Sequence, residues 1–183
     1  MMNALTITAL FLFYLFPGWQ QEKPAPKEEH SCPMHEPQKA SPEDQHHQGV
    51  VQRGDEVMGF SHEKTVHHFR LYADGGAIEA DANDAQDTAS RDAIRSHFGH
   101  IVAMFAAGDF SAPMLIHTQN PPGTEEMKRL REAIQYKLEP TERGGRIRIT
   151  TNDAAALRAV HAFMRFQITD HQTSDSPDVT KAP

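Results

Sequence analysis

Two stretches of the chain share one pattern of apolar and polar residues. In each stretch, an alternating segment precedes a Gly-Gly pair, and an Asn-Asp pair six residues later precedes a long apolar-periodic segment. The Gly-Gly pairs lie at 75–76 and 144–145, and the Asn-Asp pairs lie at 83–84 and 152–153. Alternation is typical of a half-buried strand, and apolar spacing of three and four is typical of a helix. The pattern predicts a repeat in which each copy is strand, Gly-Gly turn, strand and capped helix.

The strands are expected at 66–73, 77–82, 134–139 and 146–151. In the first strand, His67 shares a face with Phe69 and Leu71, so we expect it to be buried with them. Acidic and basic residues on the opposite faces of neighbouring strands predict a solvated ladder of ion pairs. We expect an α+β fold in which two related ββα halves form a mainly antiparallel sheet of about four strands, with two long helices on one face.

The two long helices are expected at about 87–107 and 154–170, each behind an Asn-Asp pair that caps its first turn. A shorter helix at 124–133 and an extended run at 113–117 are expected between the halves. Phe163 and Phe166 fall outside the main apolar stripe of the second long helix. Such a wide apolar surface predicts burial on two sides, either beneath another element or in a homodimer through Phe163 and Phe166.

The rest of the chain divides by composition. Residues 1–18 contain an apolar run of signal-peptide length, so we expect a signal peptide or an uncleaved N-terminal anchor. Residues 19–57 are rich in Pro, Glu, Gln and His, which predicts a disordered tether. The folded domain is expected at 58–171, with a disordered tail at 172–183. We therefore expect an exported protein, either periplasmic or membrane-anchored and facing the periplasm, with membrane contact only through an uncleaved N-terminal segment.

Charge and motifs narrow the classes of partner and reaction. The formal net charge of -7 over 183 residues argues against a nucleic-acid partner, because such a surface needs clustered Lys and Arg. The single cysteine, Cys32, excludes an internal disulfide. Neither a nucleophile elbow nor a phosphate-binding loop is found, since neither Gly-Gly pair opens a helix. The sequence names no reaction, and a non-enzymatic role is the preferred interpretation.

Four metal-ligating side chains lie close together in the tether: His30, Cys32, Met34 and His35. A thiolate, a thioether and imidazoles suit a soft or borderline ion such as copper or zinc. The run Cys32-Pro33-Met34-His35 resembles the Cys-Pro-Met-His signature of heavy-metal-binding segments on bacterial copper-transporting ATPases and efflux adaptor proteins. This local resemblance covers four residues and implies metal capture by the tether.

Five histidines of the expected domain are further candidate ligands: His67, His97, His100, His117 and His161. His97 and His100 are one helical turn apart, the spacing of a chelating pair. Each of the other three is either a hydrogen-bonded core residue or a ligand. If these three met in space near Met114 or Met164, the set would suit copper first, with zinc or haem iron ranked below it.

Between residues 58 and 171 the sequence resembles a family of small, uncharacterised and exported bacterial proteins. The matching stretches include Met58-Gly59-Phe60, the strand at 64–69, Asp74-Gly75-Gly76 and Pro121-Pro122-Gly123. The resemblance implies the limits of the domain and no activity. We expect an exported metal-binding protein, with copper as the first-choice ion. The alternatives are a ligand- or partner-binding module with structural histidines, and an enzyme that uses a buried histidine.

Overall fold

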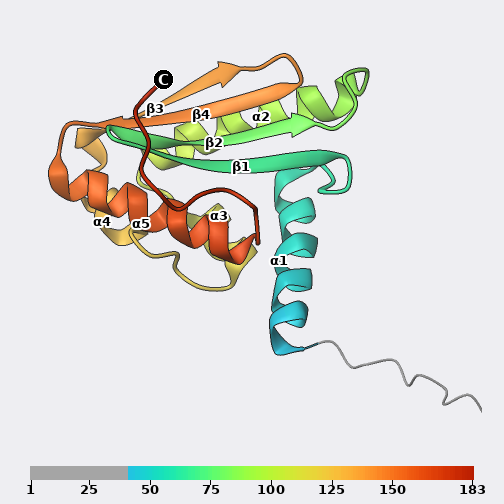
Figure 1. Cartoon of the computed structure of the whole chain (residues 1–183), viewed down its shortest axis with the longest axis horizontal. Coiled ribbons are helices and arrows are strands. Elements are labelled where there is room, and N and C mark those ends of the chain that lie inside the picture. The colour runs from blue at the N-terminus through green and yellow to red at the C-terminus, as the bar shows by residue number, and fades with distance from the viewer. Residues whose placement is uncertain (1–40) are drawn as a thin grey trace, which may run out of the picture. The chain divides into compact units, whose positions relative to one another are not determined.

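A four-stranded antiparallel sheet organises residues 41–183, the part of the chain that this computed structural model describes (Figure 1). In the order β1-β2-β4-β3, the strands are β1 (Thr65–Tyr72), β2 (Gly75–Ala82), β4 (Gly144–Thr151) and β3 (Ile134–Pro140). The helices are α1 (Pro42–Met58), α2 (Thr88–Ala106), α3 (Ser111–His117), α4 (Thr124–Arg129) and α5 (Ala154–Asp170), with a 3-10 turn at Arg131–Ala133. The predicted α+β fold with its antiparallel sheet is confirmed. The predicted signal peptide or anchor and the four tether ligands lie outside the described residues.

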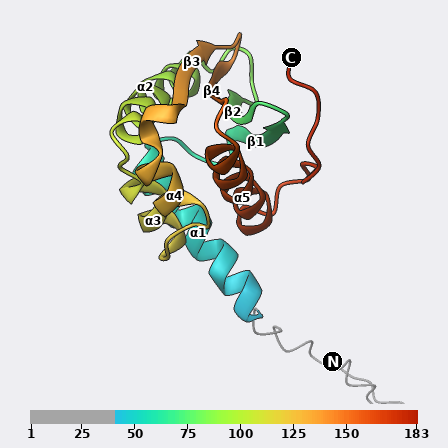
Figure 2. The ribbon, with the colours of Figure 1, turned by 90° about the vertical axis from the view of Figure 1, so that its left-hand side faces the viewer.

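The predicted repeat is visible in the strand pairing. β1-β2 and β3-β4 are hairpins, and β2 pairs with β4 in the middle of the sheet. His67 pairs with Ala80 as Tyr136 pairs with Ile149, so His67 and Tyr136 occupy equivalent places in the two halves. α2 packs mainly on β3 and β4, whereas α5 packs mainly on β1 and β2, so each helix covers the hairpin of the other half. Figure 2 shows both helices on the same side of the sheet.

The Gly-Gly pairs begin β2 and β4 and do not form the predicted turns; the β1-β2 turn is Ala73-Asp74. A Cβ at Gly75 would lie 2.0 Å from the carbonyl oxygen of Ile149, and one at Gly144 would lie 2.0 Å from that of Ala80. Only a residue without a side chain allows such close approach of two backbones. The glycines therefore make the central β2-β4 pairing possible.

Residues 42–57, predicted as part of the tether, form α1 together with Met58. Its first turn is closed by a capping box, in which the Asp44 N–H donates to Ser41 Oγ (3.1 Å) and the Ser41 N–H donates to Asp44 Oδ2 (3.0 Å). Val50 is fully buried, and Arg53 Nε donates to the Ile116 carbonyl (2.7 Å), which ties α1 to α3. The helix is mostly polar, so it carries little apolar periodicity that would reveal it.

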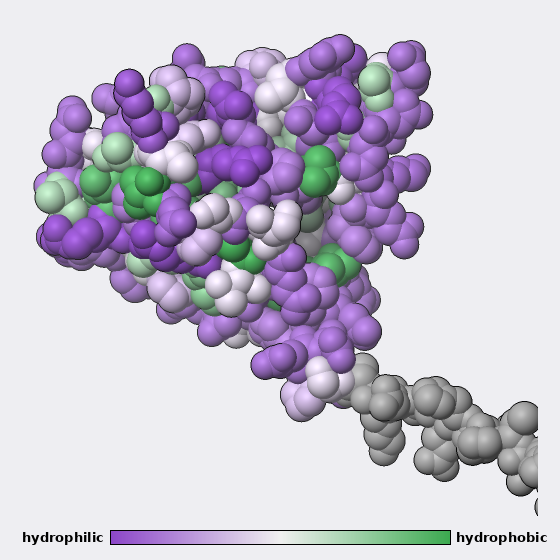
Figure 3. Space-filling view, in the orientation of Figure 1, coloured by the Kyte–Doolittle hydropathy of each residue, from purple (hydrophilic) through white to green (hydrophobic). Residues whose placement is uncertain are grey.

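α3 replaces the extended run predicted at 113–117. Pro113 lies in the first turn of this helix, where its missing N–H leaves no hydrogen bond unmade. Phe163 is 1% exposed, and its ring lies 6.0 Å from Phe105 in the core, which removes it from the predicted dimer face. Phe166 packs edge-on against His117 at 4.9 Å between ring centroids. Polar residues dominate the face of the molecule that Figure 3 shows.

Residues 172–183, predicted as a disordered tail, follow the edge strand β1 in the structure. The Asp175 carboxylate, which is almost fully buried, accepts hydrogen bonds from the Phe69 N–H (2.9 Å) and Arg70 Nη1 (2.9 Å), and it lies 3.0 Å from His68 Nδ1. Thr180 forms a parallel bridge with Tyr72. One carboxylate and a few backbone bonds hold this polar segment, so its sequence shows no hydrophobic pattern.

The outer face of the sheet carries the predicted charge ladder. Glu79 lies between Arg146 (2.7 Å) and Arg70 (3.8 Å), and Lys137 pairs with Glu139 (3.1 Å). The ladder prediction is therefore confirmed. In residues 41–183, no single helix is long and apolar enough to cross a membrane; only α2 and α3 together, bent by 112° between them, meet that measure.

Candidate functional site

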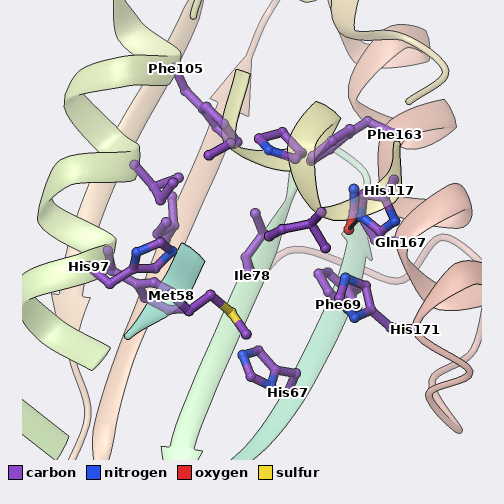
Figure 4. Close-up of a pocket in the computed structure, with 16 residues that line it drawn as sticks. Met58, His67, Phe69, Ile78, His97, Phe105, His117, Phe163, Gln167 and His171 are labelled. Carbon is purple, nitrogen blue, oxygen red and sulfur yellow. Dashed lines mark hydrogen bonds between the residues drawn. The ribbon is translucent and has the colours of Figure 1, made fainter. Parts of the chain in front are cut away.

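A cavity of about 70 Å³ lies between the inner face of the sheet and the helices (Figure 4). Aromatic and aliphatic side chains form most of its wall. The other lining side chains are four imidazoles, one amide and one thioether: His67, His97, His117, His171, Gln167 and Met58. They come from α1, β1, α2, α3, α5 and the residue after α5. A space of this size accommodates a few water-sized groups or one ion with its ligands.

His67 reaches the cavity because it shares the inner face of β1 with Phe69. Phe60 stacks on its ring, with 5.7 Å between the centroids and 14° between the planes. Its Nε2 atom is buried and has no hydrogen-bond partner. Leaving a buried polar atom unpaired costs roughly 1–3 kcal/mol, so such an atom calls for a physical explanation.

Three of the imidazoles are held neutral by their surroundings. Burial lowers the pKa of His67 to about 4 and that of His97 to about 4. Burial, with neighbouring His117 and His67 acting in the same direction, lowers the pKa of His171 to about 3. At neutral pH each of these rings keeps one unprotonated nitrogen, whose lone pair accepts a hydrogen bond or binds a metal.

His117 differs because both of its ring nitrogens are engaged. Nδ1 lies 2.5 Å from Asp170 Oδ2, and Nε2 lies 3.0 Å from Gln167 Oε1. Asp170 is also 2.9 Å from His46 Nε2 of α1. Burial raises the pKa of Asp170, but the hydrogen bonds from His117 and His46 outweigh burial, so the pKa lies below its usual value. His117 therefore joins α3 to α5 and is not free to bind a ligand as it stands.

The cavity contains three of the five predicted domain ligands, His67, His97 and His117, together with His171 and Met58, which sequence analysis missed. His171 follows Phe163 and Gln167 at intervals of four, so it continues the row of side chains on the face of α5 that lines the cavity. Figure 4 shows the Met58 thioether reaching toward His67.

The remaining two predicted ligands lie elsewhere. His161 Nε2 donates to the carbonyl oxygens of Tyr72 (2.8 Å) and Gly75 (3.1 Å), so it braces the β1-β2 turn. His100 is exposed on α2 and does not line the cavity with His97. Met114 is exposed, and Met164 is buried against Gly76. Of the three histidines considered as a converging set, His67 and His117 line the cavity and His161 does not.

The spacing of the imidazoles bears on metal binding. Within residues 41–183, no three His, Cys, Asp or Glu side chains are placed to hold one ion together. The ring centroids of His67 and His171 are 6.4 Å apart, with nearly parallel planes. With a metal–nitrogen distance of about 2.0–2.1 Å, two imidazoles on one ion have centroids about 5 to 6.5 Å apart. His67 and His171 therefore have a suitable separation, and the third donor would have to be a thioether such as Met58.

No protein-family model matches the chain, and neither the curated proteins nor the solved structures give a match. The resemblances to a bacterial family and to heavy-metal-binding segments therefore stay predictions.

Proposed function

We propose that the protein binds a soft or borderline transition-metal ion, with copper as the first choice, and that the cavity supplies a site in the folded domain. The observation that supports this proposal is the unpaired, buried Nε2 of His67, in a cavity that also contains the Met58 thioether and two other neutral imidazoles. Imidazole and thioether are donors that copper prefers. A bound ion would also remove the cost of leaving His67 unpaired.

The tether supplies a second set of donors. Its thiolate, thioether and two imidazoles, at Cys32, Met34, His30 and His35, suit the same ions as the cavity. Two donor sets of similar chemistry on one chain favour metal binding over catalysis. The enzyme and partner-binding alternatives gain less support, because His161 is used by backbone carbonyls and Phe163 is buried.

Metal titration of the full chain tests the proposal. The tether variant replaces its four donors: Cys32→Ser, Met34→Leu, His30→Gln and His35→Gln. The cavity variant replaces His67 and His171 by Leu, and His100→Gln serves as the exposed-histidine control. Each protein is titrated anaerobically with copper and with zinc, and circular dichroism checks that it is folded.

The tether variant is expected to keep one equivalent of bound copper, and the His100→Gln control is expected to match the wild type. Adding the cavity substitutions to the tether variant should abolish the remaining binding. If the tether variant binds nothing, the cavity site is wrong and the tether alone carries the function. If the wild type binds neither metal, the metal-binding proposal as a whole is wrong.

A further inference from the structure

We infer that the cavity selects a monovalent soft ion, Cu(I), over the divalent ions Cu(II) and Zn(II). This inference rests on the proposed function and concerns the same site. It depends on three properties of the cavity: the charge of its wall, the number of donors that meet there, and the chemical softness of the thioether.

The wall of the cavity carries donors without charge. Among its described lining residues there is no Asp, Glu, Lys or Arg. An imidazole binds an ion as the neutral ring, and the Met58 thioether and the Gln167 amide carry no charge at any pH. His117 is not counted among these donors, because its ring nitrogens contact Asp170 and Gln167. The nearby carboxylate, Asp170, does not line the cavity and is hydrogen-bonded to His117 and His46. An ion that enters the cavity therefore brings charge that no group there neutralises.

Charge enters the cost of desolvation as its square. Moving an ion from water into a low-dielectric site costs a divalent ion about four times as much as a monovalent ion of similar size. Sites for divalent ions commonly reduce this cost with thiolate or carboxylate ligands. The cavity offers neither, and aromatic rings such as Phe69, Phe98 and Phe105 form much of its wall. Its composition therefore disfavours the divalent ions.

The number and type of donors act in the same direction. Structural zinc sites use four ligands, whereas the described residues contain no cluster of even three His, Cys, Asp or Glu side chains for one ion. Cu(I) is stable with two or three donors. The centroids of the nearly parallel His67 and His171 rings are 6.4 Å apart, within the range of separations for two imidazoles on one ion. The thioether of Met58 is a soft third donor, a type that selects Cu(I).

The test uses the full chain with the four tether donors replaced, so that any metal binding that is measured comes from the cavity site. Cu(I) is titrated anaerobically against a chromogenic Cu(I) chelator, Ag(I) serves as a redox-inert monovalent probe, and Zn(II) and Cu(II) are titrated in parallel. Histidine ring and methionine methyl NMR signals show whether His67, His171 and Met58 are the ligands. We expect one equivalent of Cu(I) or Ag(I), and Zn(II) binding weaker by about 100-fold or more.

Two substitutions probe the reasons for selectivity separately. Met58→Leu keeps the side-chain volume and is expected to weaken Cu(I) binding by about tenfold. Gln167→Glu adds a carboxylate of the same shape to the wall, and it is expected to lower the ratio of Cu(I) to Zn(II) affinity by about tenfold or more. Circular dichroism confirms that each variant is folded.

The outcomes separate the inference from the proposed function. If Zn(II) binds at the cavity as tightly as Cu(I), the selectivity is wrong and metal binding stands. An unchanged affinity ratio in folded Gln167→Glu would likewise overturn the charge-based selectivity. If no ion shifts the signals of His67, His171 or Met58, the proposed cavity site itself is wrong.

Discussion

The two halves of the domain have the same arrangement of backbone elements but differ in the chemistry of their side chains. At the equivalent places on β1 and β3, His67 and Tyr136 each bury a polar atom without a hydrogen-bond partner. Tyr136 lies against Phe105, 5.7 Å between ring centroids, within the packed core, and burial raises the pKa of its hydroxyl. His67 instead faces a cavity with three other imidazoles. An unpaired buried polar atom therefore does not indicate a binding site by itself. It indicates a site only where other donor side chains lie around the same cavity.

Elements outside the repeat add to the difference between the halves. α1 and α3 have no counterpart in the second half, and they bring Met58 and His117 to the cavity. His171 lies just after α5, which covers the hairpin of the first half. The repeat thus builds the sheet and its two long helices and supplies His67, His97 and Gln167, and the added segments complete the candidate site beside β1.

The largest expected effect on stability comes from disrupting the central β2-β4 strand pairing, which joins the two halves. Gly75→Ala and Gly144→Ala each place a Cβ 2.0 Å from a backbone oxygen of the opposite central strand. Both substitutions should lower the free energy of unfolding by a similar amount, roughly 2–4 kcal/mol, because backbone atoms must move apart. Urea unfolding measures the change. In contrast, Gly99→Ala in α2 meets no atom within 4 Å and should stabilise the protein by roughly 0.5–1 kcal/mol.

The shared part of the fold is also the part that the sequence predicts. Strand alternation and helical periodicity identify both hairpins, both long helices and the inner-face position of His67, because local pattern and tertiary packing agree there. His67 is only partly buried, whereas Phe69 and Leu71 on the same face are buried as expected. Three features are not predicted from the sequence, because they depend on tertiary contacts between polar segments. Arg53 holds α1, Asp175 holds the C-terminal segment, and His171 lines the cavity. Which histidines meet depends on how the helices cross, and no spacing along the chain encodes that.

Acidic pH should increase the difference between the two halves. Below pH 6.5 the unfolded chain protonates its histidines, whereas the partly buried His67 and His171 stay neutral down to pH about 4 and about 3. The folded protein then binds fewer protons than the unfolded chain, so the free energy of unfolding must fall as the pH drops through this window. Each of these two histidines contributes up to roughly 1.4 kcal/mol per pH unit. Urea unfolding from pH 7 to pH 4.5 gives the slope.

A matched pair of variants assigns this slope to one half of the domain. His67→Phe should make the fall in stability shallower, because one depressed histidine pKa is gone. Tyr136→Phe should leave the slope unchanged, since the Tyr136 hydroxyl does not titrate in acid and burial raises its pKa further. Equal slopes in the wild type and His67→Phe would contradict the burial of a neutral imidazole at this position.

The same two variants at pH 7, where neither position is charged, give the smallest expected effect. Removing an unpaired buried polar atom should stabilise the metal-free protein by up to about 1 kcal/mol in Tyr136→Phe and by a similar amount in His67→Phe. Only His67→Phe should also weaken copper binding by a chain that lacks its tether donors. If His67 lowers the stability of the metal-free protein and is also needed for copper binding, it is retained for its chemistry. If His67→Phe instead destabilises the protein by more than about 1 kcal/mol, the imidazole contributes to stability and its retention needs no metal-binding role.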